Sequence, residues 1–452
     1  MKRQLRLVLI VSIMASFVAF LDGSVVNVAL PAIASNLGGG LAVQQWVVDA
    51  YLITLGSLIL LAGSLSDIFG RKRVLTYGLI GFGAASILCA ISPSSTFLIV
   101  ARGLQGLAGA LLVPSSLAII ISSFSGKAQG KAIGQWTAWT GISFIIGPLL
   151  GGFLVDTLSW RYIFAINIIP IAVCLYLISR LELKDKISKT KLDTGGAVLC
   201  SLGLFGVVFA LIEQPYFGWS SVVILAPLIL GLIALVAFVF YESKISNAML
   251  PLSLFKVRNF SAGNIATISI YGGLSIATFL IVIFLQQVGG FSALNAGLAL
   301  MPVTLVMFFL SSQFGKLAGK YGPRLFMTFG PIVAGVGFLL MLSMNTHVNY
   351  LTELLPGILL FALGLSMTVA PLTSAVLGDI DTRHSGIASA VNNAVARIAG
   401  LITIAIVGVI VGSKIDLIGF QKAIIITAIL MFAGGIISFV GIRNNLQKEV
   451  VK

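Results

Sequence analysis

The chain has 452 residues, of which 58% are hydrophobic and 9% are charged, and it carries a formal net charge of +14. A soluble domain has roughly 25% charged residues, so this composition excludes a soluble globular protein. The positive charge does not indicate a nucleic-acid partner, because the basic residues fall in short loops between apolar runs and form no basic domain.

Apolar runs of membrane-spanning length follow one another along the whole chain. A helix needs about 20 apolar residues to cross the bilayer core, and these runs are too long and too uniformly apolar for the strands of a barrel. We therefore predict an all-α membrane protein with 14 transmembrane helices, at residues 6–30, 44–64, 74–92, 97–122, 131–154, 162–180, 195–212, 221–241, 261–287, 294–315, 324–344, 352–377, 388–412 and 422–442.

Lysine and arginine concentrate in alternate loops, which predicts the orientation of the chain. With the N-terminus in the cytoplasm, nearly all of them face inward. The exceptions are Arg161, Lys414 and Lys422 in outer loops, and Arg102 and Arg397 within spans. Cytoplasmic loops carry the excess of basic residues in membrane proteins. The pattern therefore predicts a multi-pass protein of the cytoplasmic (inner) cell membrane with both termini in the cytoplasm.

Residue types that bind metals or catalyse reactions are sparse. Cys89, Cys174 and Cys200 lie in or beside apolar runs with no metal-site spacing, and the two histidines stand apart in loops. The sequence has no nucleotide-binding loop of the G-x-x-x-x-G-K-[ST] type, which argues against ATP as the energy source. We expect no enzymatic activity, no metal and no cofactor.

An internal repeat indicates a duplicated unit. The segment "GSLSDIFGRKR" (63–73) recurs in looser form as "GKLAGKYGPR" (315–324), and Pro114 in one predicted helix has a counterpart in Pro371. These matches occur in the same order at nearly the same offset, which single weak matches would not do by chance. A duplicated bundle around a central cavity is a common design of secondary transporters.

The repeat divides the predicted helices into three parts. Residues 1–180 form an N-terminal bundle of six helices. Residues 181–260 contain a polar linker and an inserted pair of helices, and residues 261–452 form a C-terminal six-helix bundle with a short cytoplasmic tail. The flanks of the inserted pair are the most polar stretches of the chain, which is typical of connections between such units.

Several motifs resemble those of the major facilitator superfamily, and in particular its fourteen-helix drug:proton antiporters. The matching segments are "LDGSVVNVALP" (21–31), "GSLSDIFGRKR" (63–73), "ARGLQGLAGA" (101–110), "GISFIIGPLLGG" (141–152) and "SWRYIFAIN" (159–167). The second copy of the loop motif departs from the first, because Gly319 stands where the first copy has Asp67.

The resemblance implies a major facilitator fold of 6 + 2 + 6 helices with two pseudo-symmetric six-helix halves. It also implies proton-coupled export of amphipathic or lipophilic organic compounds by alternating access. The proton motive force would supply the energy, and the partners would be a small amphipathic substrate, protons and membrane lipid, with the protein acting as a monomer. The alternative is a dedicated exporter or flippase for a lipid or a secreted metabolite, which would carry the same motifs.

Three charged residues on different helices share one predicted depth. Counted along the helix, Asp22 lies roughly 24 Å across a bilayer core of about 30 Å, and Arg102 and Asp49 lie about five residues inside the outer ends of their helices. An ionisable group there costs at least a few kcal/mol unless it is paired or hydrated. We interpret Asp22, Arg102 and Asp49 as a proton-coupling site. The alternatives are structural bonds for Asp22 and Arg102, and hydration at the outer interface for Asp49.

The loop motif predicts a gating latch at the inner ends of the helices, formed by Gly63, Asp67, Gly70, Arg71 and Arg73. A carboxylate beside helix N-termini and arginines can hold one part of a bundle against another. The alternative is that the basic residues only fix the topology.

The antiporter motif predicts a face of small residues, formed by Gly141, Gly147, Pro148, Gly151 and Gly152. Small residues let helices approach closely, and a proline kinks a helix. This face is interpreted as a hinge or a seal against leakage, with plain tight packing as the alternative.

Polar and aromatic residues within the spans are candidates for lining the substrate cavity. Trp136 and Trp139 are three residues apart and could stack on a flat substrate, or simply pack. Arg397 could bind an anion or extend to the inner surface. The complete set is Asn27, Trp136, Trp139, Asn392, Asn393 and Arg397.

Overall fold

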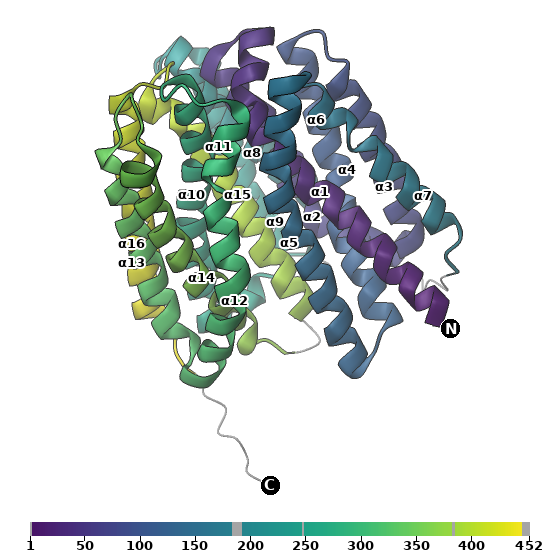
Figure 1. Cartoon of the computed structure of the whole chain (residues 1–452). Helices are drawn as coiled ribbons and strands as arrows, with labels where there is room; N and C mark the ends of the chain where they lie inside the picture. Colours follow the sequence, from purple (N-terminus) through teal and green to yellow (C-terminus); the bar gives the residue numbers. More distant parts are fainter. Residues whose placement is uncertain (1, 183–191, 246–247, 382–384, 445–452) are drawn as a thin grey trace. The chain divides into compact units, whose positions relative to one another are not determined.

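The computed structural model describes residues 2–182, 192–245, 248–381 and 385–444, and within these ranges every regular element is a helix (Figure 1). Fourteen helical segments of the described chain are long and apolar enough to cross a membrane. The predicted all-α fold with 14 spanning helices is thus confirmed. Helices suit a membrane because each satisfies its own backbone hydrogen bonds where no water is present.

The chain forms two compact units, and each is described by itself. Unit 1 comprises Met1–Leu250 and Phe291–Leu298, and unit 2 comprises Pro251–Gly290 and Ala299–Lys452. Unit 1 therefore contains the two helices that the sequence predicts as an inserted pair. The three-part division drawn from the repeat stays a prediction.

The helices of unit 1 are α1 (Lys2–Leu37), α2 (Gly40–Phe69), α3 (Arg71–Ala90), α4 (Ser95–Ser123), α5 (Gly126–Thr157), α6 (Tyr162–Ala165), α7 (Ile168–Ser179), α8 (Thr194–Phe217) and α9 (Val222–Glu242). Small residues let them pack closely. Ser16 of α1 bonds to Ser116 of α4 at 2.6 Å, and Ser66 of α2 bonds to Ser115 of α4 at 2.7 Å, in each case between hydroxyl oxygens. Hydroxyl pairs of this kind hold helices together where lipid provides no hydrophobic driving force.

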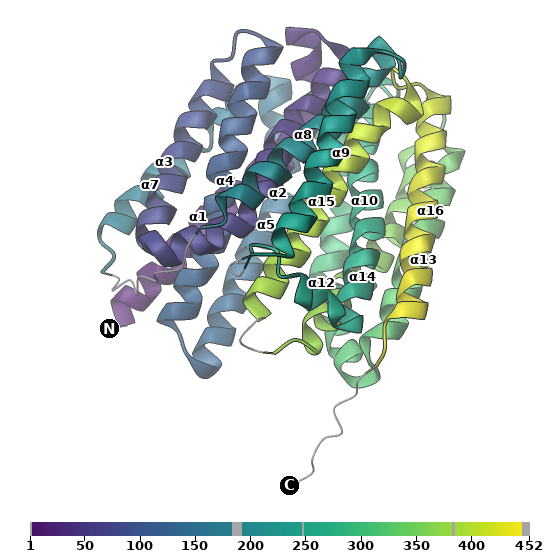
Figure 2. The same cartoon turned by 180° about the vertical axis from the view of Figure 1, so that it is seen from behind.

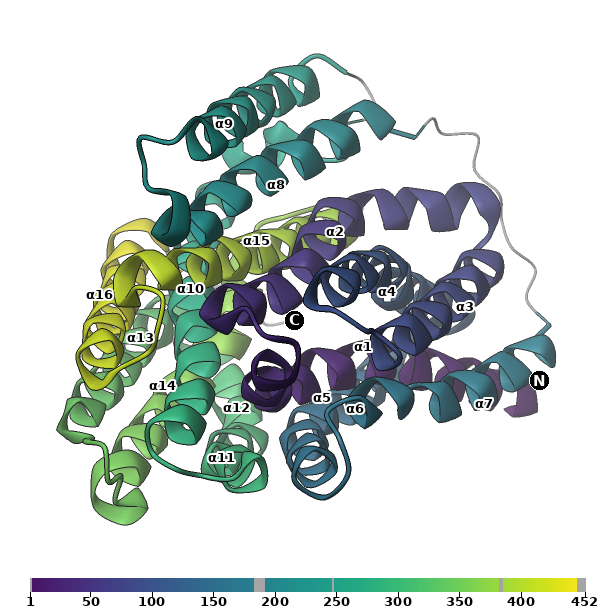
Figure 3. The ribbon, with the colours of Figure 1, turned by 90° about the horizontal axis from the view of Figure 1, so that it is seen from above.

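Helices α8 and α9 lie side by side, and α8 packs against α2 (Figures 2 and 3). Trp46 Nε1 of α2 donates to Glu213 Oε1 of α8 at 2.7 Å, and Ser201 Oγ of α8 donates to Ser57 Oγ of α2 at 2.9 Å. Helix α9 exposes most of its apolar surface, as a helix in contact with lipid does. These bonds attach the helix pair to the N-terminal bundle.

The helices of unit 2 are η1 (Leu252–Lys256), α10 (Arg258–Gln287), α12 (Met301–Tyr321), α13 (Pro323–Leu340), η2 (Met341–Ser343), η3 (Tyr350–Leu354), α14 (Leu355–Gly378), α15 (Ser385–Val411) and α16 (Leu417–Gly441). Helices α13 and α14 touch backbone to backbone, with Gly330 facing Gly364 and Gly337 facing Gly357. Helix α11 (Ala293–Ala299) begins in the short segment that belongs to unit 1.

Three predicted helices differ from the structure in their continuity. The span predicted at 162–180 is divided into α6 and α7, and the span predicted at 294–315 is divided into α11 and α12. The span predicted at 352–377 opens with the π-helical turn η3. Apolar periodicity locates a membrane segment but does not detect a local change in hydrogen-bond register, which leaves the apolar composition unchanged.

The contact between α2 and α4 depends on Gly106, and this gives a test of the packing. A methyl group there would overlap the backbone oxygen of Tyr51 and the hydroxyl of Thr54. Such overpacking costs about 1–3 kcal/mol. We expect Gly106→Ala to lower the midpoint of thermal unfolding in detergent by a few degrees.

The control is Gly103→Ala, one turn earlier on the same helix. Its added methyl group would lie 3.9 Å from the Ala50 oxygen, which is an ordinary contact. This variant should unfold at or slightly above the wild-type temperature, because alanine favours the helix. Equal midpoints for the two variants would contradict the close packing described here.

Candidate functional site

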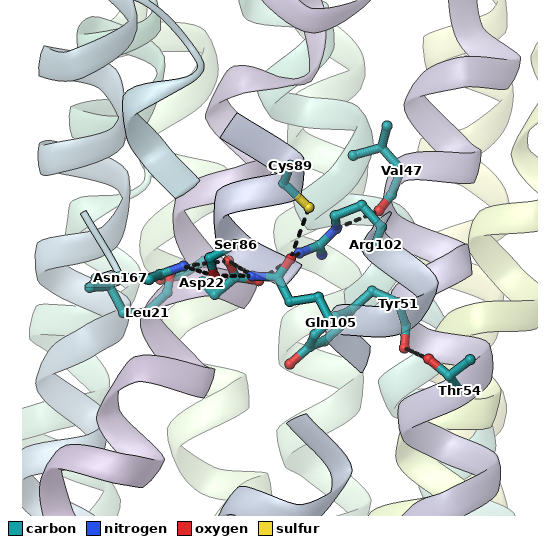
Figure 4. Close-up of polar contacts among 11 residues, drawn as sticks. Leu21, Asp22, Val47, Tyr51, Thr54, Ser86, Cys89, Arg102, Gln105 and Asn167 are labelled. Carbon is teal, nitrogen blue, oxygen red and sulfur yellow. Dashed lines mark hydrogen bonds and ion pairs between the residues drawn. The ribbon is translucent and has the colours of Figure 1, made fainter. Parts of the chain in front are cut away.

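A buried polar network occupies the interior of unit 1 (Figure 4). Asp22 of α1 is fully buried and Arg102 of α4 is 2% exposed. Helices α2, α3, α4 and α6 and the junction between α6 and α7 supply the remaining groups. Two of the three charged residues that the sequence predicts as a site are therefore in direct contact.

An ion pair forms the centre of this network. Arg102 Nη1 lies 2.6 Å from Asp22 Oδ2, and Arg102 Nε donates to the backbone oxygen of Val47 at 2.9 Å. The guanidinium carbon lies 4.4 Å from the ring centroid of Tyr51 and 5.7 Å from that of Phe164. Aromatic faces stabilise a cation, so the arginine is held by an anion, a carbonyl and two rings.

Two side-chain amides complete the shell around Asp22. Gln105 Nε2 and Asn167 Nδ2 each donate to Asp22 Oδ1 at 2.9 Å. Gln105 Oε1 in turn accepts from Arg102 Nη1 at 2.7 Å, and Ser86 Oγ accepts from both amides. Asp22 thus accepts hydrogen bonds from three residues. In each of these bonds the carboxylate is the acceptor.

Local helix geometry explains why these side chains meet. Arg102 and Gln105 are three residues apart on α4 and therefore share a face. At the junction of α6 and α7, the backbone N–H of Asn167 donates to the backbone oxygen of Phe164, three residues earlier, which is a bond of the 3-10 type. This tighter turn lies where the Asn167 side chain reaches Asp22.

Sequence reasoning missed Gln105, Asn167 and Ser86 as members of the site. Gln105 carried a usable signal, because it is one turn from Arg102 within the same motif. Asn167 ends the motif "SWRYIFAIN" but carries no charge, and Ser86 is one of many serines within spans. For these two residues only the folded arrangement supplies the evidence.

Asp49 lies apart from the network, although it belongs to the same predicted set. Its side chain is fully buried, and among the described residues neither carboxylate oxygen has a hydrogen-bond partner. Val47 and Tyr51, each two residues away on α2, are the ones that face Arg102. Residues two apart on a helix point to nearly opposite sides. Asp49 thus shares the predicted depth of Asp22 and Arg102 but forms no hydrogen bond with either of them. A role for Asp49 in proton coupling stays a prediction.

The glycine face of α5 packs mainly against α1. A side chain at Gly147 would overlap Ser24, and one at Gly151 would overlap Val25 and Val28. The hydroxyl of Ser24 also donates to the backbone oxygen of Ser143 at 3.1 Å.

The other members of the motif differ in their surroundings. A side chain at Gly152 would overlap the backbone of Leu294, which belongs to unit 1, and Pro148 lies against Gly297 of the same short segment. Gly141 has open space where a side chain would lie. Close packing therefore explains the last four members of the motif and not Gly141.

The predicted latch lies where α2 ends and α3 begins. Gly70 joins them with a φ of 94°, a conformation that glycine adopts without strain. Gly63 lies within α2, Arg71 opens α3 and Arg73 is exposed. The side chain of Asp67 is outside the described part of the structure, so the latch stays a prediction.

The predicted cavity residues fall in both units. In unit 1, Trp136 is half-buried with Nε1 donating to Ser16 Oγ at 3.1 Å, whereas Trp139 is 55% exposed, and Asn27 is half-buried. The two tryptophans thus have different surroundings.

In unit 2, Asn392 Nδ2 donates to Asn264 and Thr267 on α10 at 3.1 Å and 2.9 Å. Asn393 and Arg397 are half-buried on the same helix α15. The lining of a substrate cavity by any of these residues stays a prediction.

Comparison with known proteins shows that this membrane protein is a transporter rather than an enzyme, and gives its family. Residues 13–404 match the model of the Major Facilitator Superfamily, and the chain belongs to this family. It shares 31% identity over 408 residues with the multidrug transporter protein MdtP of Bacillus subtilis, covering 89% of this chain and 74% of that protein.

Other relatives are named after single compounds. The chain is 32% identical to the puromycin resistance protein pur8 of Streptomyces alboniger, covering 89% of this chain and 81% of the relative. It is 33% identical to the probable actinorhodin transporter of Streptomyces coelicolor, covering 87% and 70%.

Solved transporter structures share the fold. The inward-open xylose transporter XylE from E. coli aligns with a TM-score of 0.68 and 14% identity, over 97% of each chain. The peptide transporter POT in complex with sulfate aligns with a TM-score of 0.71 and 16% identity, over 96% of this chain and 93% of that one.

The buried ion pair predicts a specific pattern of stabilities. Removal of one partner of a buried pair leaves an uncompensated charge and costs about 3–5 kcal/mol, whereas removal of both costs less than the sum. We expect Arg102→Gln and Asp22→Asn each to lower the midpoint of thermal unfolding, and the double variant to lower it by less than the two shifts together.

Arg180→Gln is the matched control, because this arginine is exposed at the end of α7 and stacks on Tyr176. It should leave the midpoint nearly unchanged. Strictly additive shifts in the double variant would show that Asp22 and Arg102 do not interact.

Proposed function

We propose that the chain is a proton-driven exporter of amphipathic and lipophilic organic compounds in the cytoplasmic membrane, with both termini in the cytoplasm. The observation that carries the proposal is the ion pair of Asp22 and Arg102, buried inside a transporter bundle. An ionisable residue within a membrane span is a functional site by default, because placing a charge in the bilayer costs free energy and such residues are retained where they function. The names of the relatives, which refer to multidrug transport and to puromycin resistance, support the substrate class.

Asp22 is the group that binds the transported proton in this proposal. As an anion it accepts hydrogen bonds from Arg102, Gln105 and Asn167 and so holds these three side chains in place. Protonation removes the charge that attracts Arg102 and turns one carboxylate oxygen into a donor. The guanidinium then retains the Val47 oxygen, Gln105 and two aromatic rings as partners.

This exchange of partners couples a proton to helix positions. Asp22 lies on α1, whereas Arg102 lies on α4 and bonds to the backbone of α2. Loss of the ion pair weakens the contact of α1 with the other two helices. A proton that binds one conformation more tightly than another shifts their populations, which is the physical requirement for alternating access.

The proton motive force supplies the energy, and no cofactor takes part. The small amphipathic substrate would enter from the cytoplasm or the inner leaflet, and a monomer would suffice for transport. A second candidate function is dedicated export of a secreted metabolite, and the relative named as a probable actinorhodin transporter favours it. The two functions share one mechanism and differ in the range of substrates.

Transport in proteoliposomes tests the proposal. We expect wild-type protein to accumulate a fluorescent lipophilic cation against its gradient when a pH gradient is imposed. The Asp22→Asn variant should lose this uphill transport by at least tenfold, because residue 22 can no longer exchange a proton. It should still bind the cation and exchange it between the two sides without a pH gradient.

The control is Glu353→Gln, since Glu353 bonds to Asn345 in unit 2 and lies outside the network. It should transport as wild type does. Uphill transport by the Asp22→Asn variant at the wild-type rate would exclude Asp22 as the coupling group. Transport of one metabolite but of no other lipophilic compound would favour the second candidate.

A further inference from the structure

A second pair of buried acids lies in unit 1, apart from the Asp22 network. Asp193 is the N-cap residue of α8 and Glu242 is the last residue of α9. Their side chains are 6% and 3% exposed. The two helices are packed against each other, so the start of one meets the end of the other. Two acids at one place need partners, because burial of an unpaired carboxylate is costly.

Backbone amides satisfy three of the four carboxyl oxygens. Asp193 Oδ1 accepts from the amide of Gly196 at 2.8 Å, and Oδ2 accepts from the amide of Met249 at 3.2 Å. Glu242 Oε2 accepts from the amide of Leu250 at 2.8 Å. The two acids therefore bind the same short stretch of backbone, Met249–Leu250.

The fourth carboxyl oxygen is left without a donor in the described structure. Glu242 Oε1 accepts no hydrogen bond from any described group, and it lies with Asp193 against Gly196, where a side chain would overlap both acids. Two carboxyl groups this close can form a hydrogen bond with each other only if one of them is protonated. Since both oxygens of Asp193 already accept from amides, Glu242 Oε1 is the oxygen that is free to carry the proton.

Among the described residues no cation neutralises this pair. The described ionisable groups near it are Cys200 on α8, Tyr241 on α9 and Lys244 just after α9. Tyr241 packs against Gly195, and the Lys244 ammonium lies over the ring of Phe240, 4.2 Å from its centroid. Two adjacent carboxylates would repel each other at this site without a counter-charge.

We propose that Asp193 and Glu242 form a proton-binding clasp that holds a single proton between their carboxyl groups. The protonated clasp fixes Met249 and Leu250 against the ends of α8 and α9. Loss of the proton leaves two buried anions side by side, and their repulsion releases the segment. Leu250 is the last residue of unit 1 before unit 2 begins at Pro251. The clasp therefore restricts the motion of the backbone that connects the two units. The inference does not depend on the proposed transport function.

Infrared spectroscopy tests for the proton directly. A protonated carboxyl group has a carbonyl stretch distinct from that of a carboxylate and from those of amides. The measurement uses full-length protein with Asp49→Asn as background, because Asp49 is another buried acid. We expect an acid band that disappears at alkaline pH in this background and is absent after Glu242→Gln.

Asp193→Asn is the second variant, and it should also abolish the band. Its amide can donate to Glu242, which then ionises. Glu213→Gln on α8 is the control and should keep the band, because Glu213 accepts its bond from Trp46. A background protein without the band at any pH, or a band unchanged by both variants, would overturn the proposal.

Hydrogen exchange tests the clasp as a mechanical device. At one fixed neutral pH, Glu242→Ala should exchange the amides of Met249 and Leu250 about tenfold faster than wild type, the factor expected for one lost hydrogen bond. Glu242→Gln should keep them protected, since its amide retains an acceptor for Leu250 and a donor for Asp193. With intrinsic rates corrected, protection should fall at alkaline pH in wild type and not in Glu242→Gln. Identical pH profiles in these two proteins would contradict the clasp.

Discussion

The bond between Asp22 and Arg102 is the interaction around which unit 1 is organised. Neither charge is tolerable alone at this depth in a membrane, so each fixes the position of the other. The pair then requires its own shell, which Gln105, Asn167 and Ser86 supply from three further places in the chain. Together with the Val47 oxygen of α2, these bonds hold α1, α2, α3, α4 and the junction of α6 and α7 to one point.

Close packing around this point is the second requirement, and small residues provide it. Gly106 brings α4 against α2 next to Tyr51, whose ring also supports the Arg102 guanidinium. Gly147 and Gly151 bring α5 against α1, the helix that carries Asp22. The glycines therefore do more than fill space: they set the helix separations at which the ion pair can form.

The sequence predicts the fold well because a membrane imposes few solutions. Apolar run length and loop charge predicted 14 helices, and the depth count brought Asp22 and Arg102 to one level before any contact was known. Depth says nothing about the direction in which a side chain points. Asp49 shows this, since it shares the depth but lies two residues from the positions on α2 that face Arg102.

The sequence did not reveal site residues that are uncharged, or contacts that depend on local helix geometry and packing. Asn167 joins the site through a tightened turn between α6 and α7, which apolar periodicity merges into one helix. Asp193 and Glu242 are far apart in the sequence and stand at helix ends, where acids are ordinarily solvated. Only the packing of α8 on α9 makes them neighbours. Conversely, Gly141 fits the motif pattern, yet no described atom lies within 4 Å of where its side chain would begin.

Substrate-triggered proton release is the measurement that tests the central claim most directly. A lipophilic cation is added to purified protein in weakly buffered detergent solution, and the pH change is followed for wild type and for Asp22→Asn. If Asp22 exchanges its proton for the substrate, wild type releases protons on binding and the variant releases none while still binding the cation. Equal release from both proteins would show that the ion pair is structural and that another group couples transport to the proton.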